Sequence, residues 1–318
     1  MFDVIDRKLL AELHWNCRQT YSQLAKKLRV SKQVVSYRIK QLEKENVIQS
    51  YHALIDWRKL GYNALRIYLK WQNISSEKEQ EIYREIKANP LFMWSVKFEG
   101  EIDIGFYVWI KSIPEFSEYW FKWMGKYGKY IAKQEMYESV NMVHYPLKML
   151  NKHIPPEEKV IGTGEKQEYD NVDYTLLQQV TERGNISLVE LARKITMTPK
   201  AALYRLRKLE QQKIILGYYA LVDLKQSGYQ SYKVDFYLHD LSRLKEMQEF
   251  AKVHAHIVYR MRTIGGPDFE IELFVLDIEE LQKIILEIRQ QFSNTIRHHR
   301  FHRLDYTLKQ VYLPGNVS

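Results

Sequence analysis

The sequence contains a single cysteine, Cys17, in 318 residues, so no disulfide bond can form within the chain. It has no stretch close to the roughly 18 consecutive apolar residues of a membrane-spanning helix. The first four residues lack the basic-then-apolar pattern of a signal peptide. Glycine-rich phosphate-binding loops and nucleophile motifs are also absent from the sequence. These absences argue against a disulfide-stapled or membrane protein, and they predict a cytoplasmic protein without a cofactor.

Positive charge is concentrated in two segments of the chain. The sequence carries a net charge of +9, of which residues 1–50 contribute +5 and residues 170–217 contribute +3. A basic segment suits a polyanionic partner. We therefore expect these two segments to face an anion and the remaining segments to have another role.

One segment occurs twice. Residues 6–62 align with residues 173–229 at a constant offset of 167, with 17 identities in 57 pairs and no gap. A repeat of this length is a whole module and not a solenoid unit. The chain therefore carries two copies of one module, which we expect to pair with each other inside the chain as a pseudo-dimer.

Each copy begins with three predicted helices. Thr20 and Gln23 form a capping-box pattern before the second helix. Ser31 can cap a third helix, which begins only two or three residues after the second helix ends. Thr198 is the equivalent residue of the second copy. Two helices joined this closely form a helix-turn-helix. The extended run that follows, residues 47–55, predicts a short wing.

The third helix of each copy has a polar and basic outer face. Polar groups near the start of such a helix are what major-groove recognition requires, and flanking Arg38 and Arg205 suit phosphates. The alternative is that these faces are only solvated. The predicted contacts to double-stranded DNA are Ser31, Lys32, Gln33, Ser36, Tyr37, Arg38 and Lys40 in the first copy, and Thr198, Lys200, Tyr204, Arg205, Arg207 and Lys208 in the second.

The rest of each copy follows the order strand, helix, strand, strand, helix, strand, which is typical of a ferredoxin-like fold. Such a fold has one antiparallel sheet with two helices on one face. The alternating patterns place apolar residues on both sides of these strands, so the uncovered face needs a partner, and the other copy is the obvious one. The predicted strands are 64–71, 92–98, 102–110 and 131–143 in the first copy, and 232–238, 257–264, 269–276 and 299–308 in the second.

The two helix-turn-helix runs resemble the feast/famine regulators, the Lrp/AsnC family. The runs are YSQLAKKLRVSKQVVSYRIKQLEKENVIQSYHALID and LVELARKITMTPKAALYRLRKLEQQKIILGYYALVD. The resemblance implies a winged DNA-binding domain joined to a ferredoxin-like regulatory domain that pairs through its sheet. It also implies a small-molecule effector such as an amino acid.

In this family a glycine followed three residues later by an aspartate lies in the effector-site loop. The threonine that often precedes this glycine is replaced by Glu99 and by Ile264. A plain hairpin turn explains the same Gly-x-x-Asp spacing equally well. The candidate effector-binding residues are Gly100 and Asp103 in the first copy, and Gly265 and Asp268 in the second.

The expected fold class is α+β, with two copies of a winged helix-turn-helix followed by a ferredoxin-like βαββαβ domain. The leading hypothesis is a DNA-binding transcriptional regulator with an asymmetric target site, and further pairing between chains is left open. The alternatives are an enzyme similar to the sirohaem decarboxylases and an architectural protein that coats DNA. The expected units are 1–50, 51–150, a linker at 151–169, 170–217 and 218–318.

Three histidines, His298, His299 and His302, cluster near the last predicted strand. No cysteine or carboxylate set completes a metal site around them. A basic rim that aids solubility is the preferred interpretation, so no metal ligand and no catalytic residue is predicted.

Overall fold

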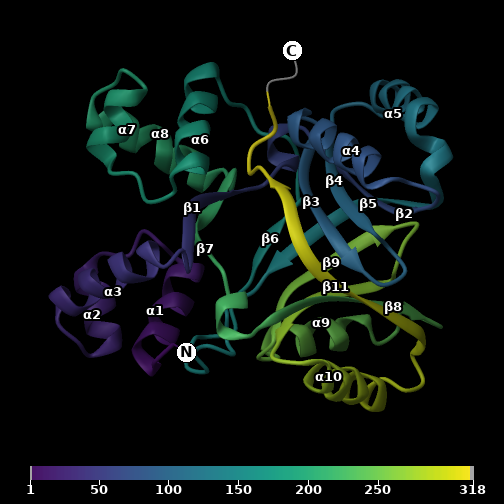
Figure 1. Ribbon diagram of the computed structural model, residues 1–318. Helices are drawn as coiled ribbons and strands as arrows, with labels where there is room; N and C mark the ends of the chain where they lie inside the picture. Colours follow the sequence, from purple (N-terminus) through teal and green to yellow (C-terminus); the bar gives the residue numbers. More distant parts are fainter. Residues whose placement is uncertain (1, 316–318) are drawn as a thin grey trace.

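The computed structural model describes residues 2–315 and contains two three-helix units beside one large sheet (Figure 1). We call these units head 1, formed by α1–α3, and head 2, formed by α6–α8. No helix in the described part of the chain is long and apolar enough to cross a membrane. The helices are α1 (Val4–Trp15), α2 (Tyr21–Leu28), α3 (Lys32–Lys44), α4 (Ser76–Ala88), α5 (Ile113–Tyr127), α6 (Asn171–Glu182), α7 (Leu188–Lys194), α8 (Pro199–Gln211), α9 (Leu244–Val253) and α10 (Ile278–Gln291).

The predicted caps begin the helices of the heads. Thr20 accepts a hydrogen bond from the Gln23 amide, and the Gln23 side chain accepts one from the Thr20 amide, which is a complete capping box. In the second copy Ser187 accepts from the Glu190 amide, while the Glu190 carboxylate pairs with Arg183 instead. Both heads therefore begin their second helix with a hydroxyl side chain as the cap. Only head 1 adds the return hydrogen bond that completes a capping box.

Strands β1 (Ile48–Ile55) and β7 (Ile215–Val222) follow the heads and pair with each other in an antiparallel ribbon. Each lies where the sequence predicts an extended wing strand, but its partner is the equivalent strand of the other copy. A strand needs a partner for its backbone N–H and C=O groups, and the repeat supplies one. The ribbon also crosses the expected boundaries at residues 50 and 217, so head and sheet are continuous there.

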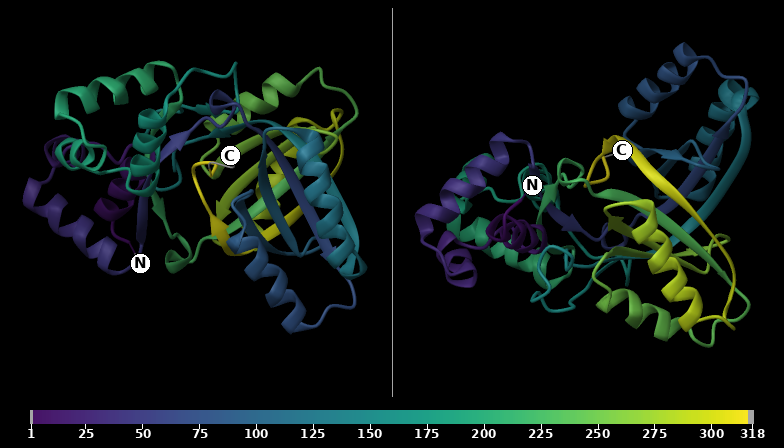
Figure 2. Two further views of the ribbon diagram at one scale, coloured as in Figure 1. Left: turned by 90° about the horizontal axis from the view of Figure 1, so that it is seen from above. Right: turned by 60° about the horizontal axis from the view of Figure 1, so that its bottom comes forward.

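The remaining strands form one nine-stranded sheet in the order β2-β4-β3-β11-β8-β10-β9-β5-β6, and β2 also pairs with β5. Eight of the strands thus close into a ring, which we call the barrel. Closure leaves these strands without free edges. Each copy contributes four strands in ferredoxin-like order, and α4 and α5, or α9 and α10, cover their outer side (Figures 1 and 2). The strands are β2 (Asn63–Trp71), β3 (Phe92–Glu99), β4 (Ile104–Ile110), β5 (Ile131–His144), β6 (Lys159–Ile161), β8 (Gln230–Leu238), β9 (Ile257–Ile264), β10 (Phe269–Val275) and β11 (Ile296–Gln310).

The two copies meet through strand edges as well as through sheet faces. β3 of the first copy pairs with β11 of the second, and β5 pairs with β9. Both joints are antiparallel, as are the pairings inside each copy. The pseudo-dimer therefore forms within a single chain and shares backbone hydrogen bonds across both seams.

The sequence-based expectation of an apolar inner sheet face is correct for only part of the first copy, which also buries Arg66 on that face, and it is wrong for the second copy. Side chains alternate along a strand, so Tyr68 points inward while Ile67 packs under the helices. On β8 the outer side is apolar, but the inner side carries Lys233 and Asp235, both fully buried. A charged inner face can be buried here because the other copy closes over it and supplies further ion-pair partners.

Residues 151–169 connect the two copies as a packed segment and not as a loose tether. β6 pairs with the end of β5. The amide of Gly162 donates to the buried Asp56 carboxylate at 2.9 Å, and the amide of Gln167 donates to the carbonyl of Lys59 at 2.8 Å. The composition predicted a linker. Its packing against the residues that follow β1, Asp56 and Lys59, depends on tertiary contacts that the composition does not show.

Candidate nucleic-acid interface

Both heads lie on one side of the molecule, next to the β1–β7 ribbon and away from the barrel helices (Figures 1 and 2). α1 packs on β7 and α6 packs on β1, so each head rests on the strand of the other copy. This crossed arrangement follows from the ribbon, because each strand passes beneath the opposite head. The heads are therefore held relative to each other through the same two strands.

In head 1 the third helix, α3, presents its predicted face to solvent. Ser31 caps the helix and accepts from the Val34 amide at 3.2 Å. The inward residues are buried, as their spacing predicts, whereas Tyr37 is 69% exposed. The predicted contact residues Lys32, Gln33 and Lys40 are exposed, and Ser36 is half-buried.

In head 2 the third helix, α8, has the same design. Thr198 accepts from the Ala201 amide at 3.3 Å, and Pro199 occupies the first turn, where proline is best tolerated. Tyr204 is 72% exposed, close to the value for its counterpart in head 1. Lys200 and Arg207 are exposed, while Lys208 is half-buried and its ammonium lies 3.6 Å from the Asp173 carboxylate.

Arg38 and Arg205 have an internal role that the sequence did not reveal. The Arg38 guanidinium lies 2.7 Å from Asp6 and 2.6 Å from Asp3, which caps α1. Arg205 lies 2.7 Å from Asp173 and 2.8 Å from Asp170, the cap of α6. Hydrogen bonds to these carboxylates raise the pKa of both arginines. Each arginine thus ties the third helix to the first, and a direct phosphate contact by either one stays a prediction.

Other exposed cations on the second helices were not among the predicted contacts. Lys26 and Lys27 lie in the last turn of α2, and Arg193 and Lys194 lie in the last turn of α7. Lys27 is 2.6 Å from Glu12, so it is engaged within head 1. The net positive charge of residues 1–50 and 170–217 already indicated that further cations lie near the third helices. They enlarge the basic surface next to the third helices.

Both Gly-x-x-Asp loops are hairpin turns whose aspartates bond to neighbouring strands. Gly100 and Gly265 have φ values of 131° and 84°, which favour glycine. The Asp103 carboxylate accepts from the Trp71 amide at 2.7 Å and lies 2.8 Å from the Lys70 ammonium. The Asp268 carboxylate accepts from the Leu238 amide at 2.8 Å. These contacts support the turn interpretation, and effector binding at the loops stays a prediction.

The three histidines of β11 separate in the structure. His302 is fully buried inside the barrel, so the basic-rim interpretation is wrong for that residue. Burial lowers its pKa to about 4, so the ring is neutral at pH 7. His298 is exposed and stacks on Tyr237, with 4.3 Å between the ring centroids. Among residues 2–315 no group of three or more side chains is arranged to hold a metal ion.

The barrel interior contains an ion-pair network that joins the copies. Arg66 of β2 pairs with Glu270 of β10, and both side chains are fully buried. Lys233 pairs with Asp235 and lies 3.0 Å from Glu270. Arg300 extends the network, since its guanidinium lies 2.9 Å from Asp235 and 2.5 Å from Glu135 of β5. The charged face of the second copy is therefore neutralised partly by the first.

Comparison with known proteins assigns the class of the heads. Residues 2–49 and 169–215 each match a family model described as winged helix-turn-helix DNA-binding. An uncharacterized HTH-type transcriptional regulator of Pyrococcus furiosus is 36% identical over 103 residues, which cover 32% of this chain and 68% of that protein. The HTH-type transcriptional regulator Ptr1 of Methanocaldococcus jannaschii is 26% identical over 142 residues, covering 45% of this chain and 86% of Ptr1.

The two heads thus define a winged helix-turn-helix protein. The chain belongs to a family of HTH-type transcriptional regulators, and it carries two copies of the winged helix-turn-helix in one polypeptide. A crystal structure of the siroheme decarboxylase NirDL shares the fold over almost the whole length, with a TM-score of 0.63, 12% identity, and coverage of 98% of this chain and 94% of that one. At this identity the likeness shows the fold alone.

Proposed function

We propose that the protein is a transcriptional regulator that binds double-stranded DNA with both heads and prefers an asymmetric site. The observation that carries the proposal is the equivalence of α3 and α8: both are capped, exposed and basic, and both stand on one shared ribbon. Such helices read base edges, and adjacent cations bind phosphates. Ser36 in head 1 corresponds to Leu203 in head 2, so the two heads offer different groups to the bases.

The best test uses Lys40 and Arg207, which occupy equivalent positions on α3 and α8 and are both exposed. Selection from random DNA with the full chain should first recover a preferred, non-palindromic sequence. Lys40→Ala and Arg207→Ala should then each weaken binding to that sequence, and each should reduce the slope of log K against log salt by about 0.9. The matched control is Lys122→Ala on α5, an exposed lysine far from the heads.

Recovery of no preferred sequence would contradict sequence-specific reading. Footprints that spread over any DNA as protein is added would instead support the architectural alternative. If only one of the two substitutions changes affinity, a single head binds DNA and the pseudo-dimer does not act as a two-headed reader. Arg38 and Arg205 are unsuitable for this test, because their loss would loosen the helices and change DNA binding indirectly.

The second candidate is an enzyme on the same fold, and it is favoured only by the whole-chain likeness to the siroheme decarboxylase NirDL. That protein was also solved with an iron-uroporphyrin III analogue. A carboxylate-rich tetrapyrrole needs cations around it, whereas Arg66, Lys233 and Arg300 are already paired with carboxylates inside the barrel. This favours a regulator without enzymatic activity. A Soret band in the purified protein, or on adding a tetrapyrrole, would favour the enzyme.

A further inference from the structure

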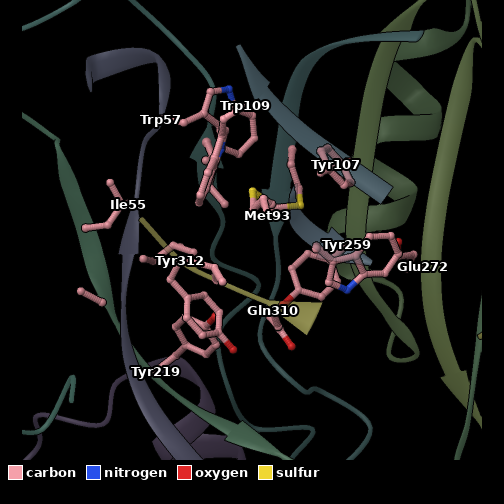
Figure 3. A pocket seen from close by; sticks show the side chains of 16 residues that line it. Ile55, Trp57, Met93, Tyr107, Trp109, Tyr219, Tyr259, Glu272, Gln310 and Tyr312 are labelled. Carbon is pink, nitrogen blue, oxygen red and sulfur yellow. The ribbon is translucent and has the colours of Figure 1, made fainter. Parts of the chain in front are cut away.

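A small cavity lies where the β1–β7 ribbon meets the barrel. Its volume is about 120 Å³, and it is lined by side chains from both copies. Figure 3 shows Trp57 and Trp109 on one side, Tyr219 and Tyr312 on another, and Tyr259 and Glu272 on a third. The cavity therefore joins the strands that carry the heads to the strands that form the barrel.

The lining combines aromatic and aliphatic side chains with one acid. Trp94 and Tyr107 also contribute to it, and none of the described residues that line the cavity is a lysine or an arginine. Aromatic faces are electron-rich and attract cations, most strongly when water is excluded. The lining thus disfavours an anionic ligand and favours a positively charged one.

Glu272 is the one acid that faces this cavity, and it makes no hydrogen bond or ion pair within residues 2–315. The other carboxylates of the barrel interior are engaged: Asp235 and Glu270 pair with Lys233, and Glu135 pairs with Arg300. The cations that influence Glu272 are Arg66 and Lys233, and each of them is paired directly with another acid, Glu270 or Asp235. Burial raises the pKa of Glu272, and the charges of Arg66 and Lys233 offset that shift only in part.

From the aromatic lining and the unpaired Glu272 carboxylate, we propose that this cavity binds a small organic cation, a primary or methylated ammonium compound. The ammonium group would lie against the aromatic faces and pair directly with the Glu272 carboxylate. The small volume limits the ligand to a few carbon atoms besides the ammonium group. Because the cavity touches both β1 and β7, its occupancy would alter the strands on which the heads rest.

The site is separate from the proposed DNA contacts, so ligand binding can be measured without DNA. Choline and 3,3-dimethylbutan-1-ol make a suitable probe pair, since they have the same shape and differ by one positive charge. Binding to the unmodified full chain is followed by calorimetry and by quenching of tryptophan fluorescence, because Trp57, Trp94 and Trp109 line the cavity. Choline should bind saturably and at least about tenfold more tightly than the neutral alcohol.

Glu272→Gln should weaken choline binding by about tenfold or more and leave the binding of the alcohol unchanged. The matched control is Glu279→Gln, which removes an exposed carboxylate from the first turn of α10. Equal affinity for the two probes, binding of neither probe, or choline binding that survives Glu272→Gln would each overturn the proposal. The comparison of probes on the unmodified protein does not depend on how well any variant folds. Failure here would leave the DNA-binding proposal intact.

Discussion

The inner faces of the two four-stranded halves of the barrel differ in chemistry, although they descend from one repeated module. The first copy presents aromatic rings, such as Tyr68, Phe98 and Tyr107, around the buried Arg66, whereas the second presents a cluster of charges, Lys233, Asp235 and Glu270. The two faces are in direct contact, since the Lys233 ammonium of the second copy lies 4.9 Å from the centre of the Tyr68 ring of the first. A pair of identical faces could not combine in this way. Fusion of the copies lets each face change while remaining complementary to the other.

The comparison also explains why the two faces should respond differently to substitution. Aromatic side chains stabilise mainly through buried area and tolerate loss of a polar tip. Buried ion pairs contribute little net stability when intact, but removing one partner leaves an uncompensated charge. The charged face should therefore lose more stability on substitution than the aromatic face, and three experiments test this difference.

The largest effect is expected for Lys233→Met, which removes the central cation of the charged face. Asp235 and Glu270 would then be buried with fewer partners, and the free energy of unfolding should fall by about 3–5 kcal/mol. Urea unfolding followed by far-UV circular dichroism measures this loss. Lys245→Met on α9, an exposed lysine, is the control and should change stability very little. If both substitutions changed the free energy of unfolding equally, the charged face would not be especially sensitive to loss of an ion-pair partner.

An intermediate effect is expected from His302, the histidine of the charged face. Burial holds its pKa at about 4 in the folded state, against about 6.5 when unfolded. The unfolded chain therefore takes up a proton below about pH 6.5 while the folded chain does not, and stability is lost as pH falls toward 4. Between pH 7 and pH 5 this residue accounts for a loss of about 2 kcal/mol.

The experiment compares the parent protein with His302→Gln by urea unfolding at both pH values. The other buried histidines titrate in both proteins, so their contribution cancels from the difference. The substituted protein should lose about 2 kcal/mol less than the parent on acidification. Identical losses in the two proteins would show that His302 is not held neutral by the fold.

The smallest effect is expected on the aromatic face, from Tyr68→Phe. The Tyr68 hydroxyl is buried and has no hydrogen-bond partner in the described part of the chain. Its removal should leave stability unchanged or raise it by up to about 1 kcal/mol. Tyr127→Phe is the comparison, because that hydroxyl donates to Glu85 at 2.6 Å and its loss should lower stability. A large loss for Tyr68→Phe would mean that the aromatic face is as sensitive to polar changes as the charged one.

Sequence reasoning was most successful where the cause is local. The caps Thr20, Ser31 and Thr198 begin helices where their side chains predicted, because a cap is decided by a hydrogen bond three residues away. The strand and helix order of both sheet domains was also predictable, since alternation and helical spacing are properties of short windows. The internal roles of Arg38 and Arg205 were missed because their partners, Asp3 and Asp170, lie 35 residues away in the sequence.

The duplication, the capped helix-turn-helix pairs and the ferredoxin-like order of strands were all predictable from the sequence, because local spacing and direct comparison of the two copies reveal them. Three features became visible only in the folded chain: β1 pairs with β7, the two sheets close into one barrel, and Glu272 faces a cavity without a direct ion-pair partner. These outcomes depend on contacts between residues that are a hundred or more positions apart in the sequence. Burial and charge balance at such meetings are properties of the assembled fold and of no single segment.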